Sequence, residues 1–375
     1  MKNKTAIVVG AGILGLATAR ALAIRGFAVT VIEKSQFSLG ASVRNFGMLW
    51  PVGQPEGKLY NRALRTKEIW LDYLTASNTP YNPCGSLHLA YCKEEMEVVE
   101  EIGGLFQSNK RPVSVISKEV VMNQYQGINP DGLLGALRSE DEVIIDPREG
   151  IKNLPPFLSE KFGINFIWGT AITKVESNTA YSGSNSYAAD LICICSGADF
   201  ETLFPELFKQ QPIQKTKLQM MRFKHKDPSF KIGASVCGGL SLLHYKSFAA
   251  STAQEQLRKK IEAEMPEYLK NGIHVMVSQN NEGELTVGDS HEYGLDFDPF
   301  DRVEINTLIL DYLKKFMHID QWEMIQSWNG VYPIMMNGAT DLYLNPAPGI
   351  HILNGIGGHG MTMSFGFAEE IINTL

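Results

Sequence analysis

The sequence has few cysteines, no excess of positive charge and no long apolar run. Five cysteines in 375 residues are too few for the disulfide framework of a small secreted domain, and they favour a reducing compartment. Basic residues number 34 and acidic residues 41, so the net charge of −7 argues against nucleic acid as the main partner. This balance does not exclude an anionic small molecule, because a binding site is a local arrangement of charge.

No segment predicts a membrane span, a targeting signal or a repeat. Arg20 and Arg25 interrupt the apolar N-terminal run, and a structured motif begins by Gly10, which leaves no room for a cleavable signal. Low-complexity tracts do not occur either. Hydrophobic residues make up 44% of the chain, enough for a large core. We therefore expect a globular cytoplasmic protein.

The N-terminal segment has the pattern of a dinucleotide-binding unit. A β-branched run over residues 5–9 leads into Gly10-Ala11-Gly12-Ile13-Leu14-Gly15 and a small-residue helix predicted through residue 23. The first glycine allows a tight turn, the second lets the backbone approach a pyrophosphate, and the third lets the helix pack against the strand. A second strand, 28–32, ends in Glu33, which is placed to bind ribose hydroxyls, with Lys34 beside it. This pattern predicts a nucleotide but does not separate FAD from NAD.

Three later segments favour FAD. They cover residues 40–51, 189–198 and 349–364, each a strand or turn rich in small residues. A NAD site needs one nucleotide fold near its motif, whereas a flavin held end to end recruits chain from all parts of the sequence. Further cofactor contacts are expected from residues in these segments, namely Ser42, Asn45, Gly47, Ser196, Gly197, Gly357, Gly358, His359, Gly360 and Met361. Resemblance to known flavoproteins implies two more contacts, Val175 in a strand near 173–176 and Met48 beside the flavin ring.

Over nearly its whole length the sequence resembles the flavin-dependent amine oxidases of the D-amino-acid oxidase, glycine oxidase and sarcosine oxidase superfamily. Four segments, 41–48, 217–222, 288–294 and 357–360, resemble more closely a subgroup associated with aminophosphonate catabolism. That resemblance implies oxidation of the C–N bond of a small anionic amine, 2-aminoethylphosphonate or its N-methyl derivative. Hydride transfer to flavin N5 would leave an imine that water hydrolyses, with oxygen or another acceptor reoxidising the flavin.

The cofactor segments lie at the beginning, middle and end of the chain, so the predicted fold is α/β with a discontinuous Rossmann-type FAD-binding domain at 1–85, 145–212 and 325–375. The inserts, 86–144 and 213–324, are predicted to form an α+β substrate domain on a mostly antiparallel sheet. Its strand candidates are 85–90, 216–223, 239–245, 274–279 and 284–288, and its helix candidates are 251–263 and 304–315. Asp146 and Pro147 predict the start of a further helix.

Departures from the superfamily pattern bear on the substrate. The arginine that clamps a substrate carboxylate in D-amino-acid and glycine oxidases corresponds to Tyr332, a second glycine oxidase arginine falls near Gly358, and a sarcosine oxidase lysine falls on Thr362. Free α-amino acids are therefore poorer candidates. A cysteine that binds flavin covalently corresponds to Gly330, so the FAD should be non-covalent. A lysine that promotes reaction with oxygen corresponds to Thr286, which leaves oxidase and dehydrogenase both open.

A phosphonate needs several hydrogen-bond donors. Met48, His291, Tyr332 and His359 are the expected catalytic residues. The candidates for substrate binding are Arg44, Asn45, Lys217, Gln219, His244, Tyr245, Gln279, Tyr293, Trp328 and Thr362. Side chains alternate along a strand, so His291 and Tyr293 should face the site together, whereas only one of His244 and Tyr245 should. No cluster of His, Cys and Asp shows metal-ligand spacing, so no metal site is predicted.

Two other functions fit the sequence less well. One is an N-methyl- or D-amino-acid oxidase or dehydrogenase whose carboxylate clamp comes from Arg44 or Arg222. The other is a non-catalytic flavin-binding module, against which the intact C-terminal glycine loop argues, because a structural flavin needs no open substrate face.

Overall fold

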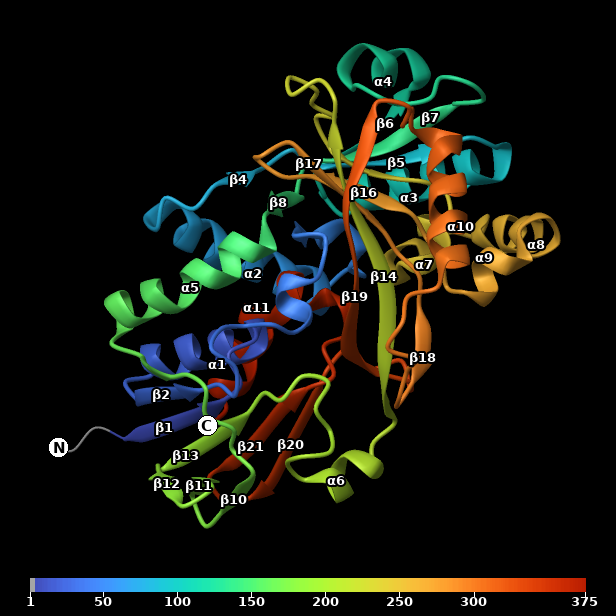
Figure 1. Ribbon diagram of the computed structural model, residues 1–375. Helices are drawn as coiled ribbons and strands as arrows, with labels where there is room; N and C mark the ends of the chain where they lie inside the picture. The colour runs from blue at the N-terminus through green and yellow to red at the C-terminus, as the bar shows by residue number, and fades with distance from the viewer. Residues whose placement is uncertain (1–3) are drawn as a thin grey trace.

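The computed structural model describes residues 4–375 as an α/β fold built on two large sheets (Figure 1). The first sheet has six strands in the order β20-β21-β13-β1-β2-β9, and all neighbours except β20 and β21 are parallel. Its strands are β1 (Thr5–Val9), β2 (Ala28–Ile32), β9 (Asn165–Ile167), β13 (Leu191–Ile194), β20 (Leu342–Ala347) and β21 (Ile350–Asn354). This parallel sheet confirms the predicted Rossmann-type architecture.

Both faces of the six-stranded sheet are covered, which explains why its strands are continuous apolar runs. One face packs against α1 (Ile13–Ile24), α2 (Lys58–Ala76), α5 (Pro147–Phe162) and α11 (Gly360–Ile372). The opposite face packs against α6 (Pro205–Lys209) and a small sheet of β10 (Lys174–Glu176), β11 (Thr179–Ser182) and β12 (Asn185–Ala188). The glycine loop therefore emerges from the centre of a rigid, buried sheet.

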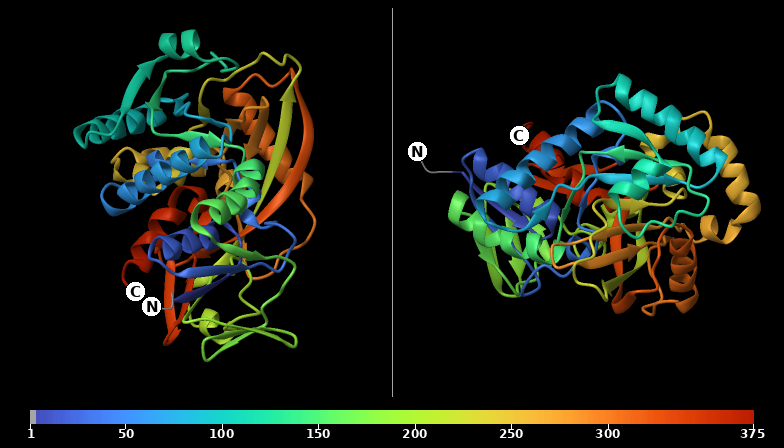
Figure 2. Two further views of the ribbon diagram at one scale, coloured as in Figure 1. Left: turned by 90° about the vertical axis from the view of Figure 1, so that its left-hand side faces the viewer. Right: turned by 90° about the horizontal axis from the view of Figure 1, so that it is seen from above.

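The second sheet has the order β18-β14-β17-β16-β15-β5-β7-β6, with β19 also paired to β14. All its pairs are antiparallel except β5 with β15. Its strands are β5 (Ser86–Ala90), β6 (Val113–Ser117), β7 (Gly135–Ser139), β14 (Ile213–His225), β15 (Ser235–Cys237), β16 (Met276–Gln279), β17 (Glu284–Gly288), β18 (Glu292–Gly294) and β19 (Trp322–Met335). The two long paired strands β14 and β19 run alongside both the first and the second sheet (Figures 1 and 2).

Helices cover the second sheet, and a small third sheet lies between the first and the second sheet. The helices are α3 (Lys93–Ser108), α4 (Lys118–Gln124), α7 (Ser241–His244), α8 (Gln254–Glu264), α9 (Pro266–Lys270) and α10 (Val303–Phe316). The third sheet consists of β3 (Met48–Leu49), β8 (Val143–Ile145) and β4 (Tyr81–Asn82). The predicted helices at 251–263 and 304–315 correspond to α8 and α10.

The predicted strand at 239–245 is wrong, because this segment forms α7. Leu240 is buried, and its backbone N–H donates to the Tyr312 hydroxyl at 3.0 Å instead of to a neighbouring strand. Gly238 and Gly239 precede the helix and allow the chain to turn as it leaves β15. The alternation argument for His244 and Tyr245 therefore does not apply.

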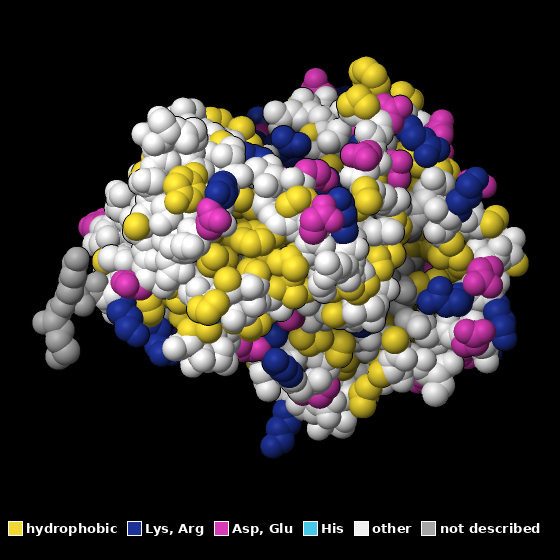
Figure 3. All heavy atoms as spheres, turned by 90° about the horizontal axis from the view of Figure 1, so that it is seen from below, with side chains coloured by type: hydrophobic (Ala, Val, Ile, Leu, Met, Phe, Trp, Pro, Cys, Tyr) yellow, Lys and Arg dark blue, Asp and Glu magenta, His cyan; other side chains and the backbone are white. Residues whose placement is uncertain are grey.

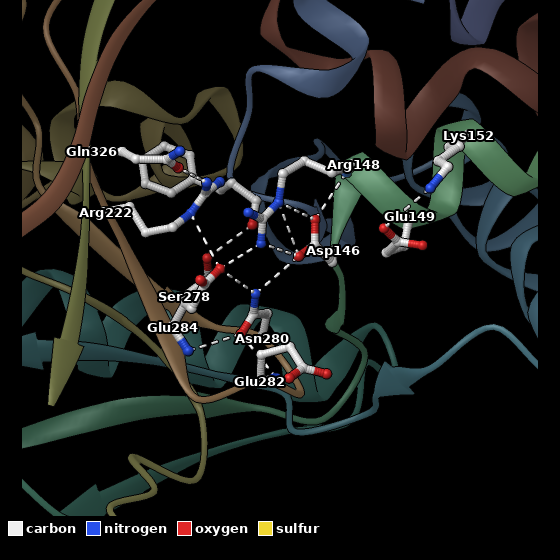
Figure 4. A network of polar contacts seen from close by, with 11 residues as sticks. Asp146, Arg148, Glu149, Lys152, Arg222, Ser278, Asn280, Glu282, Glu284 and Gln326 are labelled. Atoms are coloured by element: carbon white, nitrogen blue, oxygen red, sulfur yellow. Dashed lines mark hydrogen bonds and ion pairs between the residues drawn. The ribbon is translucent and has the colours of Figure 1, made fainter. Parts of the chain in front are cut away.

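A network of charged side chains ties the start of α5 to the second sheet (Figure 4). Asp146 caps α5 by accepting from the Arg148 backbone N–H at 2.9 Å, as predicted, and Pro147 is the first helical residue. The Arg148 guanidinium lies 2.5 Å from both Asp146 and Glu284, and Asn280 donates to the same two carboxylates. The network thus joins α5 to the β16–β17 hairpin.

No helix in residues 4–375 is both long enough and apolar enough to cross a bilayer. Figure 3 shows a face on which acidic and basic side chains are scattered among apolar patches, without a continuous basic area.

Candidate active site

A cavity of about 1380 Å³ lies between the glycine loop of the first sheet and the inner face of the second sheet. Small-molecule pockets have volumes of roughly 300–1,000 Å³. The larger volume here suits a dinucleotide and a substrate together. Its walls come from the N-terminal loop, residues 32–59, 170–173 and 195–203, the second sheet, and the C-terminal loop before α11.

At Gly10 and Gly15 the glycine loop leaves no room for a side chain. Gly10 has a φ of +103°, and a Cβ there would lie 2.4 Å from the Cys195 carbonyl oxygen. A Cβ on Gly15 would lie 1.9 Å from the Gly10 carbonyl oxygen. A Cβ on Gly12, by contrast, would meet only the Ser42 hydroxyl, at 3.3 Å, on the cavity side. This cradle and the start of α1 fit the pyrophosphate of a dinucleotide.

Glu33 holds the loop and faces the cavity at the end of β2. Its carboxylate accepts from the backbone N–H groups of Ala11 at 2.8 Å and Ser35 at 2.9 Å. Lys34 pairs with Asp199 at 2.9 Å across the same end of the cavity. The Ser42 hydroxyl accepts from the Ile13 backbone N–H at 2.9 Å. These contacts place an acid and a helix N-terminus where a ribose and a pyrophosphate would lie.

The turn before Met48 is locked by Asn45. Its amide donates to the carbonyls of Ala41 and Ser42 and accepts from the Gly47 backbone N–H. Gly47 has a φ of +71°, and a Cβ would lie 1.8 Å from the Ile145 carbonyl oxygen. Met48 is buried and lines the cavity. Asn45 and Gly47 therefore position the Met48 side chain.

The C-terminal loop forms the opposite wall, over Gly357–His359 and the first turn of α11. The Gln54 amide donates to His359 Nδ1 at 3.1 Å. Thr362 accepts from the Trp50 backbone N–H at 2.9 Å. A Cβ on Gly358 would lie 3.3 Å from the Tyr332 hydroxyl, so this hydroxyl sits against the loop. The loop thus brings Tyr332 next to the expected flavin wall.

Three histidines gather at the substrate end of the cavity, and one ring nitrogen of each lies within 4.8 Å of the others. His244 ends α7, His274 precedes β16 and His291 follows β17. The rings of His244 and His274 are stacked with centroids 3.7 Å apart, and His291 lies 5.0 Å from His244. The spacing of these residues in the sequence did not predict this cluster.

The protonation of these groups is set by burial and by their neighbours. The side chain of His244 is exposed to the cavity, but desolvation by the surrounding protein, followed by the nearby His291 and His359, holds its pKa well below the ordinary value. Burial, followed by the nearby His244, His291 and His359, also holds the pKa of His274 well below its ordinary value. Burial, with Lys246 and His291 nearby, lowers the pKa of His359 to about 4. The imidazoles of His244, His274 and His359 are therefore neutral at neutral pH.

At the same end of the cavity, the pKa values of Asp289 and Tyr332 are raised. Burial raises the pKa of Asp289 to about 6, and His291 partly counters this effect. Burial, together with Asp289 and Tyr293, holds the pKa of Tyr332 well above its ordinary value. The Tyr332 hydroxyl therefore keeps its proton and can donate it in a hydrogen bond.

Most of the residues predicted for the site line this one cavity. They are Gly10, Gly12, Ile13, Leu14, Gly15, Glu33, Lys34, Ser42, Arg44, Asn45, Met48, Ser196, Gly197, His244, Tyr245, His291, Tyr293, Tyr332, Gly357, Gly358, His359, Gly360, Met361 and Thr362. Gly47, Val175, Gln219, Gln279 and Trp328 do not line it.

Three of the predicted substrate residues have other partners. Gln219 donates to the Arg302 carbonyl at 2.9 Å, and Gln279 binds the backbone of Ile232 and Phe230. Lys217 donates to two backbone carbonyls beyond β18. The residues alternate along β14 and β16 as expected, but these side chains face helices and loops on the side away from the cavity. The side chains of Lys217, Gln219 and Gln279 therefore do not line the cavity.

His274, Asp289, Gln54 and Lys246 also line the cavity, and none of them was predicted from the sequence as a site residue. A hairpin signal could have identified the first two. Residues 280–283, Asn-Asn-Glu-Gly, separate two predicted strands, and in the structure Met276 pairs with Gly288. Beyond this pair, His274 and Asp289 exchange backbone hydrogen bonds at the open end of the hairpin.

The two arginines considered as carboxylate clamps differ in position. Arg44 lines the cavity and donates to the Asn329 carbonyl at 3.3 Å. Arg222 donates to Gln326 at 2.5 Å, lies over the Trp328 ring and approaches Glu284 within the network of Figure 4. Since it does not line the cavity, Arg222 is no clamp.

The profile of a family described as FAD dependent oxidoreductase matches residues 5–374. Glycine oxidase from Geobacillus kaustophilus superposes with a TM-score of 0.79 at 18% identity, covering 99% of this chain and 94% of that one. L-proline dehydrogenase from P. horikoshii also gives 0.79 at 18% identity, covering 99% and 93%. L-α-glycerophosphate oxidase from Mycoplasma pneumoniae, solved with FAD bound, gives 0.74 at 18% identity, covering 100% and 96%.

Curated relatives match shorter stretches. The tRNA 5-methylaminomethyl-2-thiouridine biosynthesis bifunctional protein MnmC of Saccharophagus degradans is 24% identical over 247 residues, 63% of this chain and 34% of that protein. Glycerol 3-phosphate oxidase of Mycoplasma pneumoniae is 28% identical over 156 residues, 39% of this chain and 40% of that protein. The matches thus span between a third and two fifths of these relatives.

Proposed function

The chain belongs to the DAO family of FAD-dependent oxidoreductases, and from this premise we propose that it oxidises the C–N bond of a small amine that carries an anionic group. The expected substrate is an aminophosphonate, 2-aminoethylphosphonate or its N-methyl derivative. When bound, non-covalent FAD supplies the acceptor for the hydride that leaves the carbon beside nitrogen. The resulting imine takes up water to give an aldehyde and the free amine or ammonia.

The observation that carries this proposal is the chemistry of the substrate end of the cavity. Tyr332 and three imidazoles occupy it, where the resemblance implies an arginine in the oxidases of free amino acids. A guanidinium binds carboxylate and phosphate alike. Here the O–H and N–H groups of tyrosine and histidine supply the donors that can surround a tetrahedral anion. Arg44 is the arginine that lines the cavity in the described part of the chain.

Tyr332 is the residue best placed to orient the substrate. Its hydroxyl lies beside the C-terminal loop, is buried, and keeps its proton, so it can donate to the anion or accept from the amine. The neutral His359, held by Gln54, offers a second polar contact nearby. Met48 closes the cavity with an apolar wall that excludes water from the reacting carbon.

The names of related proteins support the two halves of this proposal. Glycine oxidase, L-proline dehydrogenase and iminodiacetate oxidase act, by their names, on amines. Glycerol 3-phosphate oxidase acts, by its name, on a substrate with a phosphate group, which is a tetrahedral dianion like a phosphonate. A site for an amine with such a group lies within the range of this fold.

Anaerobic reduction of the purified yellow protein tests the proposal. The protein is mixed with 2-aminoethylphosphonate, N-methyl-2-aminoethylphosphonate, taurine, sarcosine, glycine, D-alanine and glycerol 3-phosphate, and the loss of visible flavin absorbance is followed. We expect bleaching by the aminophosphonates and little by the carboxylates. Bleaching by sarcosine or D-alanine alone would indicate an amino-acid oxidase or dehydrogenase with Arg44 as the clamp, and would refute the aminophosphonate.

A further inference from the structure

His274 and Asp289 form an incomplete ion pair at the back of the histidine cluster. His274 Nε2 lies 3.1 Å from Asp289 Oδ1, but the alignment is too poor for a hydrogen bond. Both His274 Nδ1 and Asp289 Oδ1 are buried and lack a hydrogen-bond partner within residues 4–375. A buried carboxylate without a donor is costly. A proton on His274 would turn this contact into an ion pair.

The other two imidazoles leave nitrogens free to meet a ligand. His291 Nδ1 lies 2.8 Å from the Gly272 carbonyl oxygen, so this nitrogen carries the proton and Nε2 is free. The His244 ring makes no hydrogen bond to a residue in the described part of the chain, and it is exposed to the cavity. Free ring nitrogens from two segments thus meet beside the His274–Asp289 pair.

The remaining titratable groups around the cluster are His359, Lys246, Tyr245, Tyr293 and Tyr332. Lys246 is the one permanent cation among these five, and it donates to the Gly338 carbonyl at 2.7 Å. The imidazoles of His244, His274 and His359 are neutral in the free cavity, for the reasons given above. The positive charge of the site is therefore smaller than the negative charge of a dianionic ligand.

The geometry points to a proton-coupled anion receptor, in which the N–H groups of His244 and His274 donate to a phosphonate or phosphate dianion that binds together with a proton from solvent, and this proton rests on His274 beside Asp289. His291, whose free Nε2 accepts hydrogen bonds, borders the site. This inference rests on the proposed function for the identity of the ligand. Atoms and charge balance simply, because one proton is taken up per anion and no covalent bond changes. Asp289 is a positioning residue, since it acts through His274.

The arrangement favours an anion over a metal ion. The His244 and His274 rings are stacked with an interplanar angle of 25°, so their in-plane lone pairs run side by side. A metal ion requires lone pairs that converge on one point at about 2.0–2.1 Å. Parallel N–H groups, by contrast, can reach two oxygens of one tetrahedral anion.

Calorimetric titration of the FAD-loaded protein tests this inference without turnover. Methylphosphonate is titrated in two buffers of different ionisation enthalpy at one pH, and the proton count is corrected for the separately measured ionisation of methylphosphonate. Methanesulfonate serves as the tetrahedral monoanion, acetate as the carboxylate and inorganic phosphate as the second source of a dianion. We expect methylphosphonate and phosphate to bind with net uptake of about one proton. The Kd should therefore rise by up to about tenfold for each unit by which the pH is increased.

Two variants test whether the proton taken up on anion binding resides on the His274–Asp289 pair. Asp289→Asn is expected to lower the uptake to less than half and to weaken methylphosphonate binding about tenfold, the loss of one charge-assisted interaction. His274→Gln should do the same and provides a second variant if the first does not fold. His318→Gln, an exposed histidine outside the cavity, is the matched control and should leave the proton count unchanged.

Three results would overturn the inference. They are methylphosphonate binding without proton uptake, methanesulfonate binding as tightly as methylphosphonate, and a stoichiometric metal ion whose removal by a chelator abolishes anion binding. Failure of the proposed function has a different signature. Proton-coupled binding of methylphosphonate with no amine able to reduce the flavin would leave the receptor intact and refute the oxidation.

Discussion

His274 and Asp289 hold each other at the substrate end of the cavity through both backbone and side chain. The Asp289 backbone N–H donates to the His274 carbonyl at 3.0 Å, and the His274 N–H donates to the Asp289 carbonyl at 3.3 Å. Their side chains then meet at 3.1 Å. The backbone pairing at the end of the β16–β17 hairpin therefore sets the position of the two residues.

Replacing the Tyr332 hydroxyl should affect catalysis and not cofactor content. Tyr332→Phe removes a buried hydroxyl beside the C-terminal loop and leaves the ring in place. We expect kcat/KM for the reducing amine to fall by about tenfold or more, the value of one hydrogen bond to a charged group. Steady-state kinetics and flavin absorbance per protein measure the two quantities. Tyr181→Phe, in β11, is the control, and unchanged kinetics in Tyr332→Phe would refute the role.

Two glycines of the N-terminal loop should fail in different ways. Gly15→Ala places a Cβ against the Gly10 carbonyl and should prevent folding, whereas Gly12→Ala meets only the Ser42 hydroxyl and should fold. Because Gly12 faces the cavity, its methyl group should block the close approach of the pyrophosphate. We expect Gly12→Ala to purify as a folded protein with little FAD, as measured by circular dichroism and absorbance.

Gly104→Ala in α3 is the control for this pair, since its Cβ meets no atom within 4 Å. It should keep its FAD and gain roughly 0.5–1 kcal/mol of stability from helix propensity. Full FAD content in Gly12→Ala would show that the loop does not contact the pyrophosphate.

His359 should make the FAD-free protein less stable at low pH. Its pKa is lowered from 6.5 to about 4 in the folded state, so between these values the unfolded chain binds the proton more readily. The associated free energy, on the order of 3 kcal/mol, is present above pH 6.5 and is lost as the pH falls toward 4. His359→Gln should reduce this loss.

The measurement is the free energy of unfolding in urea at several pH values for both proteins. Asp289 acts in the opposite sense, because its pKa is raised to about 6 and its protonated form favours the folded state as the pH falls. Comparing the wild-type protein with His359→Gln cancels the Asp289 contribution. Parallel stability curves for the two proteins would contradict the assignment.

Breaking the network of Figure 4 should destabilise the contact between α5 and the second sheet. Glu284 accepts from Arg148 and Asn280, and Arg222 lies 3.7 Å away. Glu284→Gln leaves these cations without their shared carboxylate and should lower the free energy of unfolding by about 2 kcal/mol. Glu282→Gln, on the exposed turn of the same hairpin, should change it little. Equal effects would show that the network contributes no stability.

The sequence by itself determined the nucleotide end of the site. Gly10, Gly15 and Glu33 lie within 24 residues, and their roles follow from local backbone geometry and from the two strands that flank one helix. The helix start at Asp146 and Pro147 was predictable for the same reason, because capping is a local interaction. Such features need no knowledge of distant chain.

Only the tertiary structure decided the substrate end. His244 sits at the end of a helix that the sequence pattern suggested was a strand, and His274 and Asp289 meet through hairpin pairing across 15 residues. Gln219 and Gln279 carry the right chemistry but point to the other side of their sheet. Which face of a strand is buried against which neighbour depends on long-range packing, and local sequence does not specify it.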